Sequence, residues 1–175
     1  MKGLSNRHPQ RYALDLLNVI LGEGMSSRLF VELREKLGLA YEVYSSVSHY
    51  LDDGVVSLYA GVDPSRIHDA IGRAIQELHR LREPIPDEDL AKAKAMVKGR
   101  LLLRTEDTRS MAAWVGVQDL LSEKVRTIDE VVKIIDAITV EDLQAVANDV
   151  ITPDKLSLAV VGPFRSQARF DRDLK

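Results

Sequence analysis

Two neighbouring segments of this chain constrain its fold more than any other feature. Residues 41–50 (YEVYSSVSHY) and 55–62 (VVSLYAGV) are rich in β-branched and aromatic residues, and LDDG joins them. Such residues favour strands, and a short turn that ends in Asp-Gly is typical of a hairpin. The sequence therefore predicts an antiparallel pair of strands in the first half of the chain.

Helical patterns lie on both sides of this hairpin. Before it, apolar residues recur at helical spacing, and Gly38 offers a stop because glycine adopts the left-handed conformation without steric cost. After it, Asp63 and Pro64 favour a helix start, TIDE is a capping box and TVED a close variant of one. The predicted helices cover residues 12–21, 29–37, 64–81, 87–103, 108–124, 128–137 and 140–150.

The last apolar run, 156–161 within KLSLAVVGP, predicts a final strand that is buried in a sheet. We expect a single α+β domain over residues 1–175, with two layers: a mostly antiparallel sheet and helices packed on one face. Three strands make a thin sheet for so much helix. We therefore expect that the domain is truncated at its N-terminal edge, or that a partner supplies a sheet edge.

Composition excludes several classes of function. The chain has 175 residues, a formal charge of −3 and a pI near 5.8, so it has no bulk attraction to nucleic acid or to anionic lipid. The basic run 92–104 alternates with core positions and lacks aromatic partners, which indicates a solvated helix face. No apolar run reaches the roughly 18 residues of a membrane span, and no secretory signal opens the chain. We expect a cytoplasmic protein.

Residues able to hold a metal or to act as nucleophiles are sparse. The chain has no cysteine, and none of its four histidines forms a His-x-x-Glu-His motif or its reverse. His79 and Glu83 are four apart, but no third ligand is near them. The serines lie in no Gly-x-Ser-x-Gly motif, and GEGMSS lacks the ending of a phosphate loop. We predict that this chain alone binds no metal and no cofactor.

The stretch 27–46 (SRLFVELREKLGLAYEVYSS) holds the two most capable side chains, Arg34 and Tyr41, on either side of the Gly38 stop. Arginine stays protonated and offers a rigid fork of donors, and a tyrosine hydroxyl with a pKa of about 10 donates at pH 7. Two donors aimed at one place suit a carbonyl oxygen that gains negative charge. The alternative is structural: the stem of Arg34 covers apolar surface and Tyr41 packs.

The segment LGEGMSSRLFVELREKLGLAYEVYSS closely resembles the C-terminal-domain signature of the pitrilysin-type metallopeptidases. This family includes insulysin and the mitochondrial processing peptidase, and the likeness is greatest to its short bacterial members. It extends from HPQRYALDLLNVILG to VVGPF, so it covers most of the chain. By this resemblance, Arg34 and Tyr41 are the family's arginine and tyrosine seven residues apart, and Gly38 is the turn between them.

The resemblance implies half of a zinc-dependent endopeptidase. Arg34 and Tyr41 would contact substrate carbonyls and stabilise the tetrahedral intermediate, while zinc, its water and a glutamate base belong to an N-terminal domain or a partner subunit. The implied partners are a peptide or an unfolded polypeptide as substrate and that zinc-binding part. Apart from the resemblance, we expect a homodimer, because a truncated domain leaves hydrophobic surface that a second copy can cover. The alternative from another class is a non-catalytic scaffold or subunit of a larger assembly.

Overall fold

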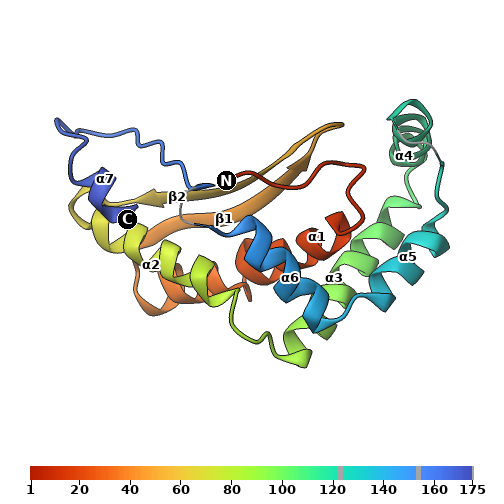
Figure 1. Ribbon diagram of the computed structural model, residues 1–175, viewed down its shortest axis with the longest axis horizontal. Coiled ribbons are helices and arrows are strands. Elements are labelled where there is room, and N and C mark those ends of the chain that lie inside the picture. The colour runs from red at the N-terminus through yellow and green to blue at the C-terminus, as the bar shows by residue number, and fades with distance from the viewer. Residues whose placement is uncertain (122–123, 153–154, 175) are drawn as a thin grey trace.

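The computed structural model describes residues 1–121, 124–152 and 155–174. Its sheet is one antiparallel pair, β1 (Ala40–His49) and β2 (Gly54–Val62), which confirms the predicted hairpin. The register pairs Ala40 with Val62 at one end and His49 with Gly54 at the turn. The two strands form a long curved ribbon above the helices (Figure 1).

The predicted helices are confirmed, within one or two residues at most ends. Both capping boxes are complete. The side chains of Thr127 and Thr139 each accept a hydrogen bond from the backbone N–H three residues on, and the carboxylates of Glu130 and Asp142 accept from the backbone N–H of the two threonines. The end of the helix expected over 108–124 lies outside the described residues. The helices are α1 (Arg11–Gly22), the π-helix η1 (Phe30–Lys36), the 3₁₀ turn η2 (Pro64–Arg66), α2 (Ile67–Arg80), α3 (Asp87–Arg104), α4 (Thr108–Leu121), α5 (Ile128–Ala137), α6 (Val140–Val150) and α7 (Phe170–Asp173).

The fold is the expected two-layer α+β arrangement, with helices on one face of the sheet. Helix α1 lies beneath β1 and packs against α3 and α6 as well (Figure 1). Val43 and Val56 point into this core and are buried, whereas Tyr44 and Tyr59 stand on the open face with ring centroids 5.1 Å apart. None of the described helices is long and apolar enough to cross a membrane.

Helix α1 approaches β1 closely because it ends in a glycine. A Cβ on Gly22 would lie 2.4 Å from the backbone nitrogen of Ser45, closer than real Cβ contacts allow. The hydroxyl of the buried Ser45 donates to the side-chain oxygen of Asn18 at 2.7 Å, so its polar group is satisfied within the contact. Gly22 therefore sets the spacing between the helical layer and the sheet.

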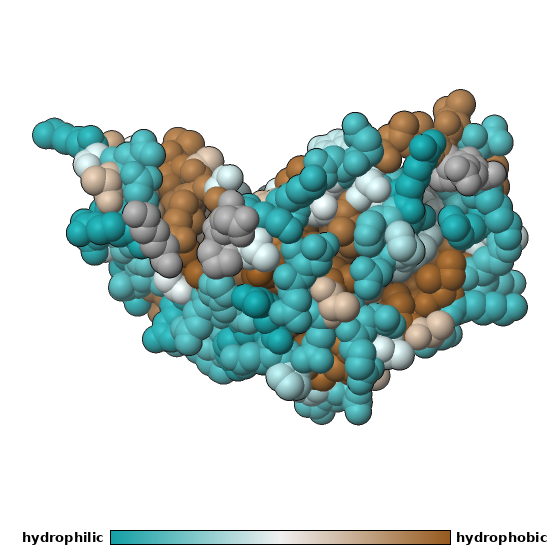
Figure 2. Space-filling model, in the orientation of Figure 1, coloured by the Kyte–Doolittle hydropathy of each residue, from teal (hydrophilic) through white to brown (hydrophobic). Residues whose placement is uncertain are grey.

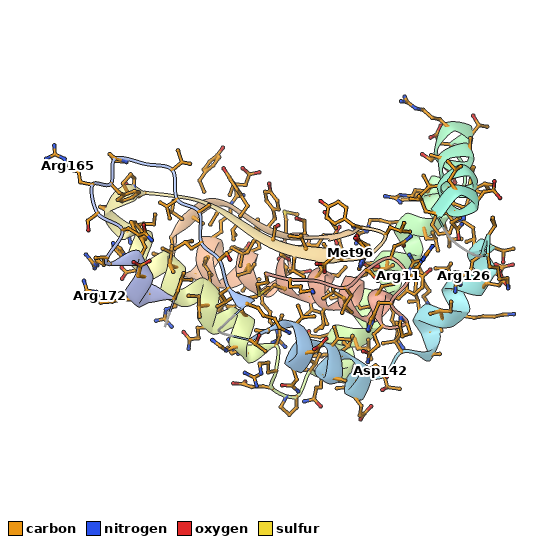
Figure 3. All side chains as sticks on the ribbon, turned by 45° about the horizontal axis from the view of Figure 1, so that its top comes forward. Arg11, Met96, Arg126, Asp142, Arg165 and Arg172 are labelled. Carbon is orange, nitrogen blue, oxygen red and sulfur yellow. The ribbon has the colours of Figure 1, made fainter. Side chains whose placement is uncertain are left out.

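Helix α4 stands away from the body and is held by the loop before α5. The Gln118 side chain accepts from the Arg126 backbone N–H at 3.0 Å and donates to the Arg126 carbonyl at 3.3 Å. Trp114 is half-buried, and its ring nitrogen reaches the same carbonyl at 3.4 Å. Figure 3 labels Arg126 where this loop meets the base of α4 and the start of α5. Trp114 thus packs at a helix junction, as its apolar neighbours predict.

The predicted final strand is wrong. Residues 156–161 are extended and run beside β2 (Figure 1), but they form no strand in the part of the chain that the structure describes. Leu158 is 38% exposed and Val161 is fully exposed, so the run is not buried as its composition suggests. A strand needs a neighbour about 4.8 Å away to pair with. Here an apolar groove separates the segment from β2.

Candidate functional site

The corner is the segment 30–41, which joins the second helix to the start of β1, and its helical part is wider than an α-helix. The sequence pattern predicts an ordinary helix, but residues Phe30–Lys36 wind as a π-helix, and the N–H of Leu37 donates to the carbonyl of Glu32 at 3.2 Å. Leu33 is completely buried and anchors this turn in the core. Single π-turns are frequent at functional sites, because they shift side chains relative to the helix around them.

Gly38 ends this helix and turns the chain into the sheet. Its φ of +56° lies in the left-handed region, and the N–H of Leu39 then donates to the carbonyl of Leu33 at 2.7 Å. Strand β1 starts at Ala40, directly after Leu39. The structure therefore gives Gly38 the predicted role of a helix stop.

Tyr41 sits at an irregularity in the ladder. Ala40 pairs with Val62 and Glu42 with Gly61, so Tyr41 is an extra residue with no partner on β2. Such a bulge re-aims the extra side chain. The Tyr41 side chain is accordingly 85% exposed, and an open hollow of about 540 Å³ lies beside it, lined by residues 38–41 and 61–63.

Arg34 and Tyr41, the two predicted site residues, lie next to each other. The guanidinium carbon of Arg34 is 5.6 Å from the centre of the Tyr41 ring and 5.0 Å from that of Phe30. Both distances are within the range of cation–π contacts. Both site residues are exposed, and among the described residues neither side chain makes a hydrogen bond or an ion pair. The N–H groups of the guanidinium and the phenolic hydroxyl are thus free to donate to a ligand.

Two further residues support the corner, and sequence reasoning did not single them out for it. Phe30 carries the guanidinium on its ring; its spacing of four from Arg34 is the signal that could have identified this contact. Arg66, from the turn η2, donates to the carbonyls of Leu37 and Gly38 at 3.3 and 3.4 Å. No sequence signal links Arg66 to the corner, because the contact joins segments almost 30 residues apart.

The described residues do not fit a zinc site. No three histidine, cysteine, aspartate or glutamate side chains come together within the described ranges in a way that could hold a metal ion. Structural and catalytic zinc sites use at least three protein ligands. Any role of this corner in metal-dependent chemistry therefore requires a metal held by other residues.

The fold matches that of a solved domain of the same kind. A crystal structure of a peptidase M16 inactive domain from Pseudomonas fluorescens superposes with a TM-score of 0.80 at 23% identity, over 88% of this chain and 37% of that one. Residues 1–97 match the family model described as the peptidase M16 inactive domain. The chain belongs to the M16 peptidase family, as the resemblance to pitrilysin-type enzymes predicts.

Longer relatives carry the same region. An uncharacterized zinc protease of Streptomyces coelicolor is 38% identical over 168 residues, which are 95% of this chain and 36% of the relative. An uncharacterized zinc protease of Bacillus subtilis is also 38% identical, over 93% of this chain and 40% of the relative. The chain thus spans about two fifths of the curated relatives that it matches.

Proposed function

We propose that this domain supplies the half of a zinc-dependent endopeptidase site that grips a peptide and stabilises charge. The observation that carries the proposal is the pairing of Arg34 and Tyr41 at an exposed corner, with ring and guanidinium in contact and both sets of donors free. Membership of a family whose relatives are named zinc proteases supports the reaction class.

The chemistry follows from the donor geometry. A guanidinium that stacks on an aromatic face keeps its N–H groups at the edge of its plane, where they can point to an acceptor. The Tyr41 hydroxyl lies at the far end of a ring that the bulge turns outward. Both groups can donate to a substrate carbonyl oxygen, and these hydrogen bonds strengthen as the oxygen gains charge in the tetrahedral intermediate.

The zinc belongs to another part of the enzyme in this proposal. A zinc-binding N-terminal domain or a partner subunit would face the corner, and the substrate would be a peptide or an unfolded polypeptide. We further propose that the working assembly is a homodimer. This chain's own contribution is to bind, to orient and to stabilise charge, so the domain alone is expected to be inactive.

The test is steady-state kinetics of the assembled full-length enzyme on a quenched fluorescent peptide. Tyr41→Phe removes one donor and is expected to lower kcat on the order of 10²-fold, with a smaller effect on KM. Arg34→Lys keeps the charge but loses the fork, so it is also expected to be impaired. The matched controls are Tyr50→Phe and Arg73→Lys, which change exposed side chains outside the corner.

Parent-like turnover by Tyr41→Phe would refute the proposed stabilisation of the carbonyl oxygen. If Arg34→Lys turns over peptide as fast as the parent enzyme, Arg34 contributes only its positive charge and not a directed pair of hydrogen bonds. If the full-length assembly binds neither zinc nor peptide, the proposal of a non-catalytic scaffold replaces the proposal of an endopeptidase.

A further inference from the structure

A cavity of about 570 Å³ lies among α1, β1 and the helices α3, α4 and α5. Buried apolar residues of three helices line it, among them Val19, Leu101 and Ile135, and the half-buried Trp114 lines it from α4. Figure 2 shows hydrophobic patches set among hydrophilic residues at the right, over α3, α4 and α5. A hollow of a few hundred Å³ that combines an apolar lining with a few polar groups is typical of a small-molecule site.

The charged side chains of this cavity are unevenly paired. Among the described residues, those that line it are Asp15, Glu23, Arg100 and Arg104. Both carboxylates already have partners: Asp15 is hydrogen-bonded to His49 at 3.1 Å, and Glu23 forms an ion pair with Arg100. Arg104 is exposed and makes no hydrogen bond or ion pair within residues 1–121, 124–152 and 155–174. It is therefore the charge of the cavity that has no counterion in the described structure.

The two arginines of the cavity also repel each other. Arg100 and Arg104 are four residues apart on α3, so they are neighbours on one face of the helix. Partial burial and then the charge of Arg104 lower the pKa of Arg100, in spite of its partner Glu23. An anion bound beside Arg104 would offset this repulsion and accept hydrogen bonds from its guanidinium. The unbalanced charge thus favours a ligand with a negative group.

A single negative charge suits the cavity better than two. Asp15 and Glu23 line the same space, so both would repel a dianionic phosphate more strongly than a monoanion. A carboxylate carries one charge, and its two oxygens match the fork of a guanidinium. The hydroxyl of Tyr12, which also lines the cavity, accepts from Arg11 at 2.6 Å and keeps its own proton to donate to a ligand.

We propose that this cavity binds a carboxylate attached to an apolar body, a chemistry shared by small carboxylic acids and by the C-terminal residue of a peptide. The carboxylate pairs with Arg104, and the apolar body packs against Trp114 and the buried residues of α5. None of the described lining residues belongs to the corner, segment 30–41. The proposal therefore does not rest on the peptidase role.

The test is a fluorescence titration, because Trp114 is the only tryptophan of the chain and lines the cavity. The probes are hexanoate and N-acetyl-alanyl-alanyl-leucine, and the matched uncharged controls are hexanamide and the amide of the same peptide. We expect a saturable change in Trp114 emission with at least one acid, and an affinity on the order of tenfold lower for its amide. The acid that binds identifies the source of the ligand. Inorganic phosphate should bind more weakly than that acid.

Variants of α3 then locate the carboxylate. Arg104→Ala removes the unpaired cation and is expected to weaken acid binding on the order of tenfold. Arg104→Lys should retain part of the affinity, because it keeps the charge but loses the fork. The matched control is Lys92→Ala, which removes an exposed cation of the same helix outside the cavity and should leave binding unchanged.

Chemical shifts of the Val131 and Ile135 methyl groups, which line the cavity, provide a second measurement that does not depend on the tryptophan. They should move with the bound acid and return to the free values in Arg104→Ala at the same acid concentration. Equal affinity for acid and amide, or parent-like binding by Arg104→Ala, would overturn the proposal. The absence of a saturable response to either acid by both measurements would overturn it as well, and so would tighter binding of phosphate.

Discussion

Gly38 offers a sharp test of the corner that carries the candidate site. Its φ is +56°, and a Cβ added there would meet no atom within 4 Å. Replacement by alanine therefore creates no clash with another segment, and the cost comes from the backbone conformation alone. Left-handed geometry costs an L-residue roughly 1–2 kcal/mol. We expect Gly38→Ala to lower the free energy of unfolding by about that amount.

Gly99 provides the matched control in the same chain. It lies inside helix α3, and a Cβ there also meets nothing within 4 Å. Because glycine is a poor residue in a helix interior, Gly99→Ala is expected to raise the free energy of unfolding by roughly 0.5–1 kcal/mol. The same chemical change should thus have opposite signs at the two positions.

The assay is urea unfolding of parent and variants followed by far-ultraviolet circular dichroism, with m-values compared to verify a shared unfolded state. Gly38→Asn should lose less than Gly38→Ala, since asparagine tolerates the left-handed region better. If Gly38→Ala stabilises the protein as Gly99→Ala does, the helix does not end in a left-handed residue. The geometry inferred for Arg34 and Tyr41 would then fail with it.

Two other sites yield predictions of a different kind. Partial burial lowers the pKa of His49, but its hydrogen bonds to Asp15 (3.1 Å) and to the Leu4 carbonyl (2.7 Å) outweigh this and raise the pKa above 6.5. Because the folded pKa is the higher one, this stabilisation is complete below about pH 6.5 and is lost as pH rises through the folded value. The stability difference between parent and His49→Gln should therefore shrink from pH 6 to pH 9 in thermal unfolding, and a constant difference would contradict it. Gly22→Ala forces a methyl group to within 2.4 Å of the Ser45 backbone nitrogen, so calorimetry should show that the free energy of unfolding falls by about 1–3 kcal/mol. The control is Gly116→Ala, whose added methyl group meets no atom within 4 Å and should cause no such loss.

Local features of the sequence were enough to predict most elements. The hairpin, the two capping boxes and the Gly38 stop depend on residues that are neighbours in the chain. Helix periodicity likewise locates a buried face without knowledge of what covers it. The resemblance to a family motif singled out Arg34 and Tyr41 as candidate site residues, and their role stays a prediction.

Other features depend on contacts between distant segments, and the sequence could not supply them. A single-residue bulge at Tyr41 is visible only in the register of β1 against β2, and the support from Arg66 joins segments almost 30 residues apart. The apolar run 156–161 was predicted as a strand from its composition, yet a strand requires a neighbour to pair with.

The sequence by itself determined which segments are helical or extended and where most of them stop, because backbone preferences and periodicity act over a few residues. It also supplied Arg34 and Tyr41 as candidates for a site. Only the tertiary structure decided that the Arg34 guanidinium lies close to the rings of both Phe30 and Tyr41, and that β2 keeps an open edge toward residues 156–161. The physical reason is that cation–π contacts and sheet hydrogen bonds are set by distances across space, which chain order does not encode.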